Sequence, residues 1–306
     1  MDTLRRFGRL LPQAWRNRLR AWQLRAQSAW RSKLDSPTAS VDESTPAELD
    51  CRFCGTPSAR HHVIGRVPLT HGGPFEQGNY RLLHCSACDV VYLDPQPGAG
   101  DLEILYRDSV QFEDATYSDV TAAARVLDTY GRRLDRLELV PEPGQSLLEV
   151  GAGLAWVSRA CKVRRPAVRT IAQDVSSECA ASCPWVDQYL VGPIHAVPTE
   201  ERFTLISMTH VIEHLADPAE MLAQLNTRTA PGGRIYITGP YRPPLWKSRD
   251  GIRPWLRYSY LHVPAHIAYL SENWFRRIAE RTGFDLAHWD DSHDGHQVFE
   301  VMLRKR

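Results

Sequence analysis

The sequence lacks any apolar run of about 18 or more residues, so no membrane-spanning helix is expected. Its N-terminus also lacks the apolar region of a secretory signal, which argues against export. The composition, with 43% hydrophobic and 24% charged residues, is that of an ordinary globular protein. The expected location is therefore the cytoplasm, with attachment to a membrane surface as an addition discussed below.

Disulfide bonds are not expected either, although the chain has seven cysteines. Four of them form two CxxC pairs, Cys51 with Cys54 and Cys85 with Cys88, separated by thirty residues. Two such pairs can place four thiolates tetrahedrally around zinc. Residues 50–98 are too few to build a large core, so the metal would supply folding energy. Because four thiolates leave no open coordination position, the predicted zinc is structural.

The small net charge of +1 hides a basic N-terminal arm. Residues 1–34 contain nine Arg or Lys and one acid, which is +8, and the rest of the chain carries −7. Leu4, Phe7, Leu11 and Trp15 recur at helical spacing between the arginines. Residues 1–35 are therefore predicted to form a basic amphipathic helix on an anionic membrane surface. Docking on the protein body, a transit peptide and a nucleic-acid arm remain alternatives, and nucleic acid is the least favoured partner.

Residues 36–49 are rich in Pro, Ser, Thr and acids and are predicted to be a linker. From residue 99 to 306 the sequence alternates strand and helix patterns, which is typical of an α/β doubly wound, mostly parallel sheet. The strand signals lie at 146–150, 168–173, 186–191, 203–208, 234–238, 284–289 and 297–303. Only a short turn separates the last two, so they are predicted to pair as an antiparallel hairpin.

A glycine turn follows the first of these strands, where "LLEVGAGLAW" begins at residue 147. Gly151 and Gly153 fit a nucleotide-binding turn, but Trp156 stands where a dinucleotide fold requires its third glycine. An oxidoreductase is thereby disfavoured. Glu149 suits a ligand that bears an ammonium group, and Asp174, at the end of the next strand, suits ribose hydroxyls.

Taken together, "LLEVGAG", "AQDVS", "HVIEHLADPAEMLAQLNTRTAPGGRIYITGP" and "HVPAHIAYLSENWFRRIAERTGF" resemble the successive motifs of class I S-adenosylmethionine-dependent methyltransferases. With "CRFC" and "CSACDVVYLDPQP", the chain resembles the bacterial subgroup with an N-terminal zinc ribbon, which is common in loci for cell-surface glycans and natural products. The resemblance implies a seven-stranded sheet with an antiparallel last strand. It implies S-adenosylmethionine as cofactor, held by Glu149, Gly151, Ala152, Gly153, Asp174 and Met208. Ala155 departs from the family, which has a glycine there.

The acceptor side of the predicted site contains a group of ionisable residues after the fourth strand. His210, Glu213 and His214 are spaced so that they can share one helical face, and His266 could reach the same crevice. Similar clusters in small-RNA 2′-O-methyltransferases and ubiquinone-pathway O-methyltransferases bind a divalent metal. Those enzymes have Glu where this chain has His210. Three interpretations stay open: a metal-free histidine base, a divalent ion such as Mg²⁺, and residues that brace the cofactor lid.

Residues 241–263 carry a charge of +4 and four Trp or Tyr residues beyond Tyr241. In this fold such an insertion covers the acceptor, and arginines with aromatic rings suit a sugar attached to an anion. The alternative is that the aromatic rings pack a lid and the arginines face solvent. The preferred function is methyl transfer to a hydroxyl of a sugar, glycan or related intermediate. C- or O-methylation of a small metabolite and a non-catalytic scaffold are the alternatives.

Overall fold

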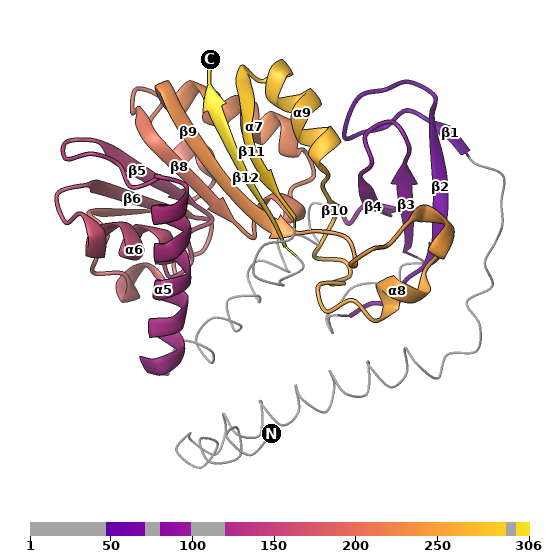
Figure 1. Cartoon of the computed structure of the whole chain (residues 1–306), viewed down its shortest axis with the longest axis horizontal. Coiled ribbons are helices and arrows are strands. Elements are labelled where there is room, and N and C mark those ends of the chain that lie inside the picture. Colours follow the sequence, from indigo (N-terminus) through magenta and orange to yellow (C-terminus); the bar gives the residue numbers. More distant parts are fainter. Residues whose placement is uncertain (1–46, 71–79, 99–119, 292–297) are drawn as a thin grey trace, which may run out of the picture.

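The computed structural model describes residues 47–70, 80–98, 120–291 and 298–306, in which two sheets lie side by side (Figure 1). The larger sheet has the strand order β11-β12-β9-β8-β5-β6-β7. Its strands are β5 (Ser146–Val150), β6 (Arg169–Asp174), β7 (Gln188–Val191), β8 (Phe203–Thr209), β9 (Thr229–Pro240), β11 (Phe284–Asp290) and β12 (Val298–Lys305). Strands β5 to β9 run parallel, and β12 pairs antiparallel with both β9 and β11. The predicted fold class is confirmed, including the antiparallel last strand.

Both faces of the larger sheet are covered by helices because its strands are apolar on both sides. The helices are α5 (Val120–Arg136), α6 (Trp156–Arg164), α7 (Pro218–Arg228) and α9 (Glu272–Arg281). Successive residues of a strand point to opposite faces. Leu147 accordingly packs with Val157 of α6, whereas Leu148 belongs to the core shared with Leu225 of α7 and Phe275 of α9. This alternation gives the sheet two separate hydrophobic cores.

The helices α7 and α9 begin at well-formed N-caps. Asp217 accepts a hydrogen bond from the amide of Glu220, and Pro218 occupies the first turn of α7. Ser271 caps α9 in the same way by accepting from the amide of Trp274. Such caps satisfy backbone amides that have no partner inside the helix, so the start of α9 is fixed.

The smaller sheet combines segments that are distant in sequence. Its order is β1-β2-β3-β4-β10, and its strands are β1 (Ala47–Leu49), β2 (Ala59–Arg66), β3 (Arg81–Cys85), β4 (Val91–Asp94) and β10 (Ala268–Tyr269). Figure 1 shows β10 at the junction between the two sheets. Strand β1 comes from the end of the predicted linker, and β10 comes from the predicted methyltransferase region. The sheet is thus larger than the predicted 50–98 module.

Residues 241–263, which we call the lid segment, lie over the smaller sheet. They contain η4 (Ser248–Asp250) and α8 (Arg253–Leu256). Trp246, Trp255 and Tyr258 are buried in one cluster with Leu82 and Leu93 of the smaller sheet. The neighbouring residues on those strands, Leu83 and Tyr92, point to the other face and join the core of the larger sheet. These three aromatic rings therefore pack the protein interior and do not line an acceptor site.

Some predictions fall outside the described residues. They include the amphipathic helix at residues 1–35 and residues 36–46 of the linker, which stay predictions. Within the described ranges, no helix is both long and apolar enough to cross a membrane.

Candidate functional site

The glycine turn between β5 and α6 adopts a conformation that requires glycine. Gly151 and Gly153 have φ values of 59° and 46°, in the left-handed region. A Cβ atom on Gly151 would lie 2.4 Å from Cγ2 of Val211, which is closer than non-bonded atoms approach. The amide of Ala152 donates to the carbonyl of Gln173 at 3.0 Å. The turn is therefore held against the end of β6 and the loop after β8, at the carboxyl edge of the sheet.

Glu149 is buried, with 2% of its surface exposed, and its carboxylate binds the start of α6. Oε1 accepts from the amide of Val157 at 3.1 Å, and Oε2 accepts from the amide of Ser158 at 2.7 Å. A carboxylate at a helix N-terminus is stabilised by unpaired amides and by the helix dipole. Glu149 thus orients the helix that follows the turn, and its predicted contact with an ammonium group stays a prediction.

Asp174 joins the end of β6 to the glycine turn. Its Oδ2 accepts from the amide of Gly153 at 2.8 Å, and its Oδ1 accepts from the amide of Ser176 at 2.9 Å. The side chain is half-buried, so it remains accessible from the crevice. Met208, by contrast, is fully buried in the hydrophobic core, where its side chain packs. Of these two predicted cofactor residues, Asp174 has the side chain placed to meet a ligand.

The predicted acceptor-side residues gather after β8, although not on a helical face. His210 has φ 55° and precedes η3 (Ile212–His214), a single short turn. The expected sharing of one helical face is therefore wrong. Proximity comes instead from the sharp bend at His210 and from the return of the chain at His266. The His214 and His266 rings have centroids 4.8 Å apart, and Nδ1 of His210 lies 3.5 Å from Oε1 of Glu213.

Three of these residues, Glu213, His214 and His266, form what we call the Glu–His cluster. Each offers one ligand atom, and these atoms lie within 4.8 Å of one another. Nδ1 of His214 lies 2.8 Å from the carbonyl oxygen of Ala265, and Nδ1 of His266 lies 2.8 Å from that of Tyr260. A nitrogen facing a carbonyl carries the proton, so in the neutral form of either ring Nε2 has the lone pair. Metal-binding histidines are commonly held in this way.

The charge state of the cluster favours a cation. Glu213 is 1% exposed, and among the described residues no hydrogen-bond donor reaches either carboxylate oxygen. Burial, together with the neighbouring His214 and His262 rings, holds the pKa of His266 well below its ordinary value. His266 is therefore neutral and cannot form an ion pair with Glu213. A buried carboxyl group without a hydrogen-bond donor is costly, and a bound cation would remove that cost.

His210 differs from the cluster because 40% of its side chain is exposed. Its ring lies nearly parallel to that of Tyr260, at an interplanar angle of 11° and a centroid distance of 6.2 Å. A non-glycine residue with positive φ is uncommon and recurs at functional sites. Sequence reasoning grouped Tyr260 with the other aromatic residues of 241–263 and missed its relation to the histidines: its ring stacks on His210, and its carbonyl orients His266. Only its place in an aromatic segment before "HVPAH" signalled a role.

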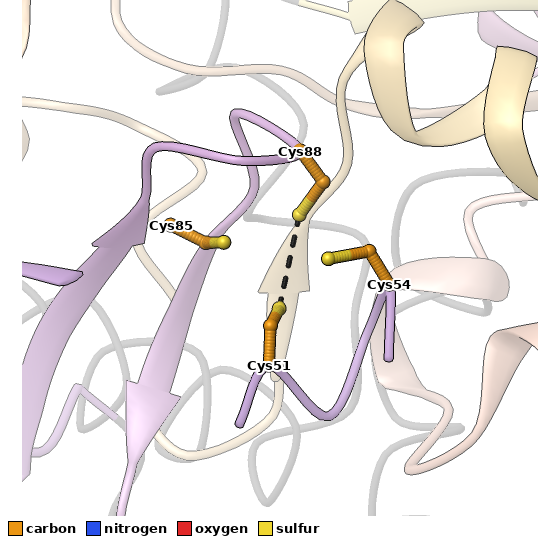
Figure 2. A group of neighbouring side chains, drawn as sticks. All are labelled: Cys51, Cys54, Cys85 and Cys88. Carbon is orange, nitrogen blue, oxygen red and sulfur yellow. Dashed lines mark hydrogen bonds between the residues drawn. The ribbon is translucent and has the colours of Figure 1, made fainter. Parts of the chain in front are cut away.

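The four predicted zinc ligands come together where β3 of the smaller sheet ends, at Cys85. Figure 2 shows the sulfurs of Cys51, Cys54, Cys85 and Cys88 pointing toward one centre. All four side chains are buried, and the sulfurs lie within 4.8 Å of one another, with 3.8 Å between Cys51 and Cys88. We call this group the Cys cluster. Hydrogen bonds with Cys51 and Cys85, together with burial, raise the pKa of Cys88 well above its ordinary value. Four buried thiolates can coexist only around a cation, and all-sulfur ligation suits zinc.

Comparison with known proteins agrees with this geometry. A protein-family model described as a methyltransferase domain matches residues 122–288, more than half of the chain. The chain belongs to this methyltransferase domain family. The match spans the glycine turn, Asp174 and the Glu–His cluster, so the two groups at the carboxyl edge of the sheet lie within the family domain.

Individual relatives are similar over parts of their length. A 37.1 kDa protein in transposon TN4556 of Streptomyces fradiae is 30% identical over 138 residues, which is 42% of this chain and 39% of that protein. A ubiquinone biosynthesis O-methyltransferase of Aeromonas salmonicida is 32% identical over 57 residues, or 19% of this chain and 24% of the enzyme. The chain thus spans well under half the length of either relative. The crystal structure of an S-adenosylmethionine-dependent methyltransferase from Mesorhizobium loti matches with a TM-score of 0.47 and 16% identity, covering 58% of this chain and 100% of that one.

Proposed function

We propose that the protein transfers a methyl group from S-adenosylmethionine to a hydroxyl oxygen, with a divalent cation bound by the Glu–His cluster. The observation that carries this proposal is Glu213, a buried carboxyl group that no hydrogen-bond donor of the described residues reaches and that lies in one cluster with the His214 and His266 rings. Val211, two residues before it, packs against Gly151 of the glycine turn. The cluster therefore borders the predicted cofactor crevice.

Within this proposal the chain's own residues bind and orient both substrates. The glycine turn accommodates the methionine portion of the cofactor, and Asp174 accepts hydrogen bonds from its ribose. Glu213, His214 and His266 would hold the cation, which supplies positive charge that lowers the pKa of a hydroxyl beside it. His210, the exposed imidazole next to Glu213, would take the proton as the acceptor oxygen attacks. Methyl transfer is an in-line displacement, so positioning of the two substrates supplies much of the rate.

This assignment combines two of the interpretations that the sequence left open. A histidine base and a divalent cation need not exclude one another, because His210 lies outside the Glu–His cluster. His266 is a poor candidate for the base, since it is 6% exposed and its Nδ1 faces the Tyr260 carbonyl. The bracing interpretation would leave the buried carboxyl group of Glu213 without a hydrogen-bond donor among the described residues.

For the acceptor we propose a hydroxyl of a sugar, glycan or related intermediate. Fewer aromatic rings of the lid segment can contact a sugar than its composition indicates, because Trp246, Trp255 and Tyr258 are buried. Tyr260, half-buried beside His210, is the aromatic ring placed to contact an acceptor. Methylation of another small metabolite at oxygen or carbon is the alternative. In the same proposal, the Cys cluster holds a structural zinc, because its four buried sulfurs are the ligand set that zinc prefers.

A cation-binding and turnover experiment tests the proposal. Mn²⁺ titration followed by electron paramagnetic resonance should show one site that is lost in His266→Ala and retained in His195→Ala, an exposed histidine elsewhere on the domain. Transfer of labelled methyl from S-adenosylmethionine should be measured on a panel of sugar, phenolic and carbon acceptors, with and without chelator. Cofactor binding without turnover on any acceptor would favour the scaffold. Chelator-resistant turnover would remove the cation from the mechanism.

A further inference from the structure

The Glu–His cluster is assembled from two parts of the molecule. Glu213 and His214 lie on η3, directly after β8 of the larger sheet. His266 lies some fifty residues later in the chain, between the lid segment and β10 of the smaller sheet. The three ligand atoms converge only if these two segments keep their relative positions.

Hydrogen bonds fix the backbone on both sides of His266 to β4 of the smaller sheet and to Thr70, which follows β2. The amide of Val263 donates to Oγ1 of Thr70 at 2.7 Å, and the amide of Thr70 donates to the carbonyl of Val263 at 3.0 Å. On the other side, the amide of Leu93 in β4 donates to the carbonyl of Ile267 at 2.9 Å. The amide of Ile267 donates in turn to the carbonyl of Glu213 at 2.8 Å. Ile267 thus links the smaller sheet directly to the Glu–His cluster.

The Cys cluster is tied to the same stretch of chain through both of its CxxC turns. Side chains of α9 and its N-cap donate to four carbonyl oxygens of those turns: Trp274 to Phe53, Arg281 to Cys54, Asn273 to Ala87 and Ser271 to Cys88. Ser271 and Trp274 are fully buried, so their two contacts, one with each CxxC turn, lie in the protein interior. Strand β10 ends two residues before Ser271 and pairs with β4. The segment after His266 is therefore held by both CxxC turns and by β4.

We infer that the metal-bound Cys cluster is a positioning device that holds His266 within reach of Glu213 and His214. The inference rests on the proposed cation site. A cation at the Cys cluster fixes the two CxxC turns, these turns fix the start of α9 and β10, and β10 with Thr70 and Leu93 fixes His266. Glu213 and His214, by contrast, are carried by the larger sheet. Loss of metal from the Cys cluster would then separate His266 from the other two ligands without altering the glycine turn.

The physical reason for this dependence is the composition of the smaller sheet. Its edge strands are short, with three residues in β1 and two in β10, and the four thiols of the Cys cluster are buried. Metal binding at such a cluster supplies folding energy to the chain around it. The core that contains Leu147 and Val157 is formed by the larger sheet with α5 and α6, whereas the core that contains Leu148 is shared with Leu83 and Tyr92 of the smaller sheet. The two binding sites should therefore respond differently to removal of the metal.

The first experiment uses Cys88→Ser in the full-length protein, with Cys161→Ser as the matched control. Cys161 is equally buried but belongs to α6 and packs in a different core from the Cys cluster. Mn²⁺ is the probe for the Glu–His cluster because it prefers oxygen and imidazole ligands to thiolates. Cys88→Ser should lower Mn²⁺ affinity about 10- to 100-fold, the range found when supporting partners of a metal ligand are removed. Affinity for S-adenosylmethionine should stay within about twofold in both variants.

A second variant tests the positioning without disturbing the Cys cluster. Thr70→Val removes the hydroxyl that accepts from the Val263 amide and keeps the zinc ligands. Thr227→Val, an exposed threonine of α7 whose hydroxyl donates to Gln224, is its control. Thr70→Val should lower Mn²⁺ affinity with zinc content unchanged. This variant also keeps the inference testable if Cys88→Ser fails to fold.

Hydrogen exchange separates failure of this inference from failure of the proposed function. On removal of zinc, amides in residues 261–275 should lose protection, whereas amides in residues 146–160 around the glycine turn should not. Equal Mn²⁺ affinity with and without zinc overturns the positioning role even if the cation site is real. If wild-type protein binds no Mn²⁺, the proposed cation site is wrong, and the exchange data alone decide whether zinc positions His266. Unchanged protection at 261–275 would then refute the inference.

Discussion

The amide of Gly153 donates a hydrogen bond to Oδ2 of Asp174 across 2.8 Å. This contact joins the turn after β5 to the end of the neighbouring parallel strand, β6. Carboxyl ends of parallel strands meet at one edge of a sheet, which is where ligands bind in doubly wound folds. The two sequence features that predicted a nucleotide site are therefore parts of one structural unit, and a change in either should affect the same ligand.

Replacing Asp174 with Asn should weaken binding of S-adenosylmethionine about 10- to 100-fold, because hydrogen bonds to a charged acceptor contribute about 1.5–3 kcal/mol. Isothermal titration calorimetry measures the change. Asp128→Asn is the control, since Asp128 is an exposed residue of α5 that pairs with Arg132. Equal affinity in the two variants would show that Asp174 serves the protein's own loops and not the cofactor.

A substitution at Gly151 should be more damaging than the same change at Gly144. Both glycines have positive φ, at 59° and 84°, so alanine costs about 1–2 kcal/mol of strain at each. Only at Gly151 would the new Cβ meet a neighbour, Val211, whereas nothing lies within 4 Å at Gly144. Gly151→Ala should therefore lower both the melting temperature and cofactor affinity, and Val211→Ala should partly restore them. No rescue by the second substitution would argue against the steric explanation.

Local sequence patterns were sufficient to predict the larger sheet. The strand expected at 146–150 is β5 as observed, and the others differ mainly at their ends, because alternating or continuous apolar residues mark buried strands directly. The two-residue strand β10 could not be predicted in this way. Its pairing with β4 depends on chain packing between residues about 175 apart. The partners of Glu149 were not predicted either, although these amides of α6 lie only eight and nine residues further along the chain, because a sequence pattern does not show where a buried side chain points.

The sequence indicated which residues lie near one another in the candidate sites, but not how their side chains are arranged. Cysteine spacing alone predicted the Cys cluster, because the two cysteines of a CxxC pair lie on one tight turn that brings their sulfurs together. The acceptor-side residues were named correctly as neighbours, yet the helical spacing used to group them does not exist in η3. For Trp246 and Trp255 composition left two interpretations open, contact with the acceptor or packing of a lid, and the tertiary structure shows that they pack against the smaller sheet.

Purified protein should contain about one equivalent of zinc per chain, and Cys85→Ser should abolish it while Cys161→Ser does not. Zinc binds thiolate, and the pKa of Cys88 is raised in the metal-free cluster, so metal binding must release protons. Zinc affinity should accordingly fall as the pH is lowered. Metal analysis after dialysis at a series of pH values measures this. Zinc content independent of both Cys85 and pH would rule out the assignment.

Replacing Trp255 with Ala should destabilise the fold by about 3–5 kcal/mol, as expected for a fully buried tryptophan. Urea unfolding measures this loss. At a temperature where the variant stays folded, its KM for the acceptor should be close to that of wild type. Tyr260→Ala should show the opposite pattern, with a small loss of stability and a raised KM, because Tyr260 is half-buried beside His210. A large KM change in Trp255→Ala alone would favour the other interpretation, in which the aromatic rings of the lid segment contact the acceptor.

Glu213 permits a prediction that needs no acceptor. In protein that retains zinc but has no cation at the Glu–His cluster, no hydrogen-bond donor of the described residues reaches the buried carboxyl group of Glu213, so Glu213→Gln should leave the melting temperature unchanged or raise it. A cation at about 100 times its dissociation constant stabilises the folded state by about 2.7 kcal/mol. For a domain of this size that corresponds to a rise of about 5–10 °C in wild type, and to none in Glu213→Gln. Differential scanning calorimetry with and without Mn²⁺ measures all four values, and Glu220→Gln, an exposed glutamate of α7, is the control. If Glu213→Gln lowers the metal-free melting temperature and keeps the full response to Mn²⁺, Glu213 is a structural residue and the cation lies elsewhere.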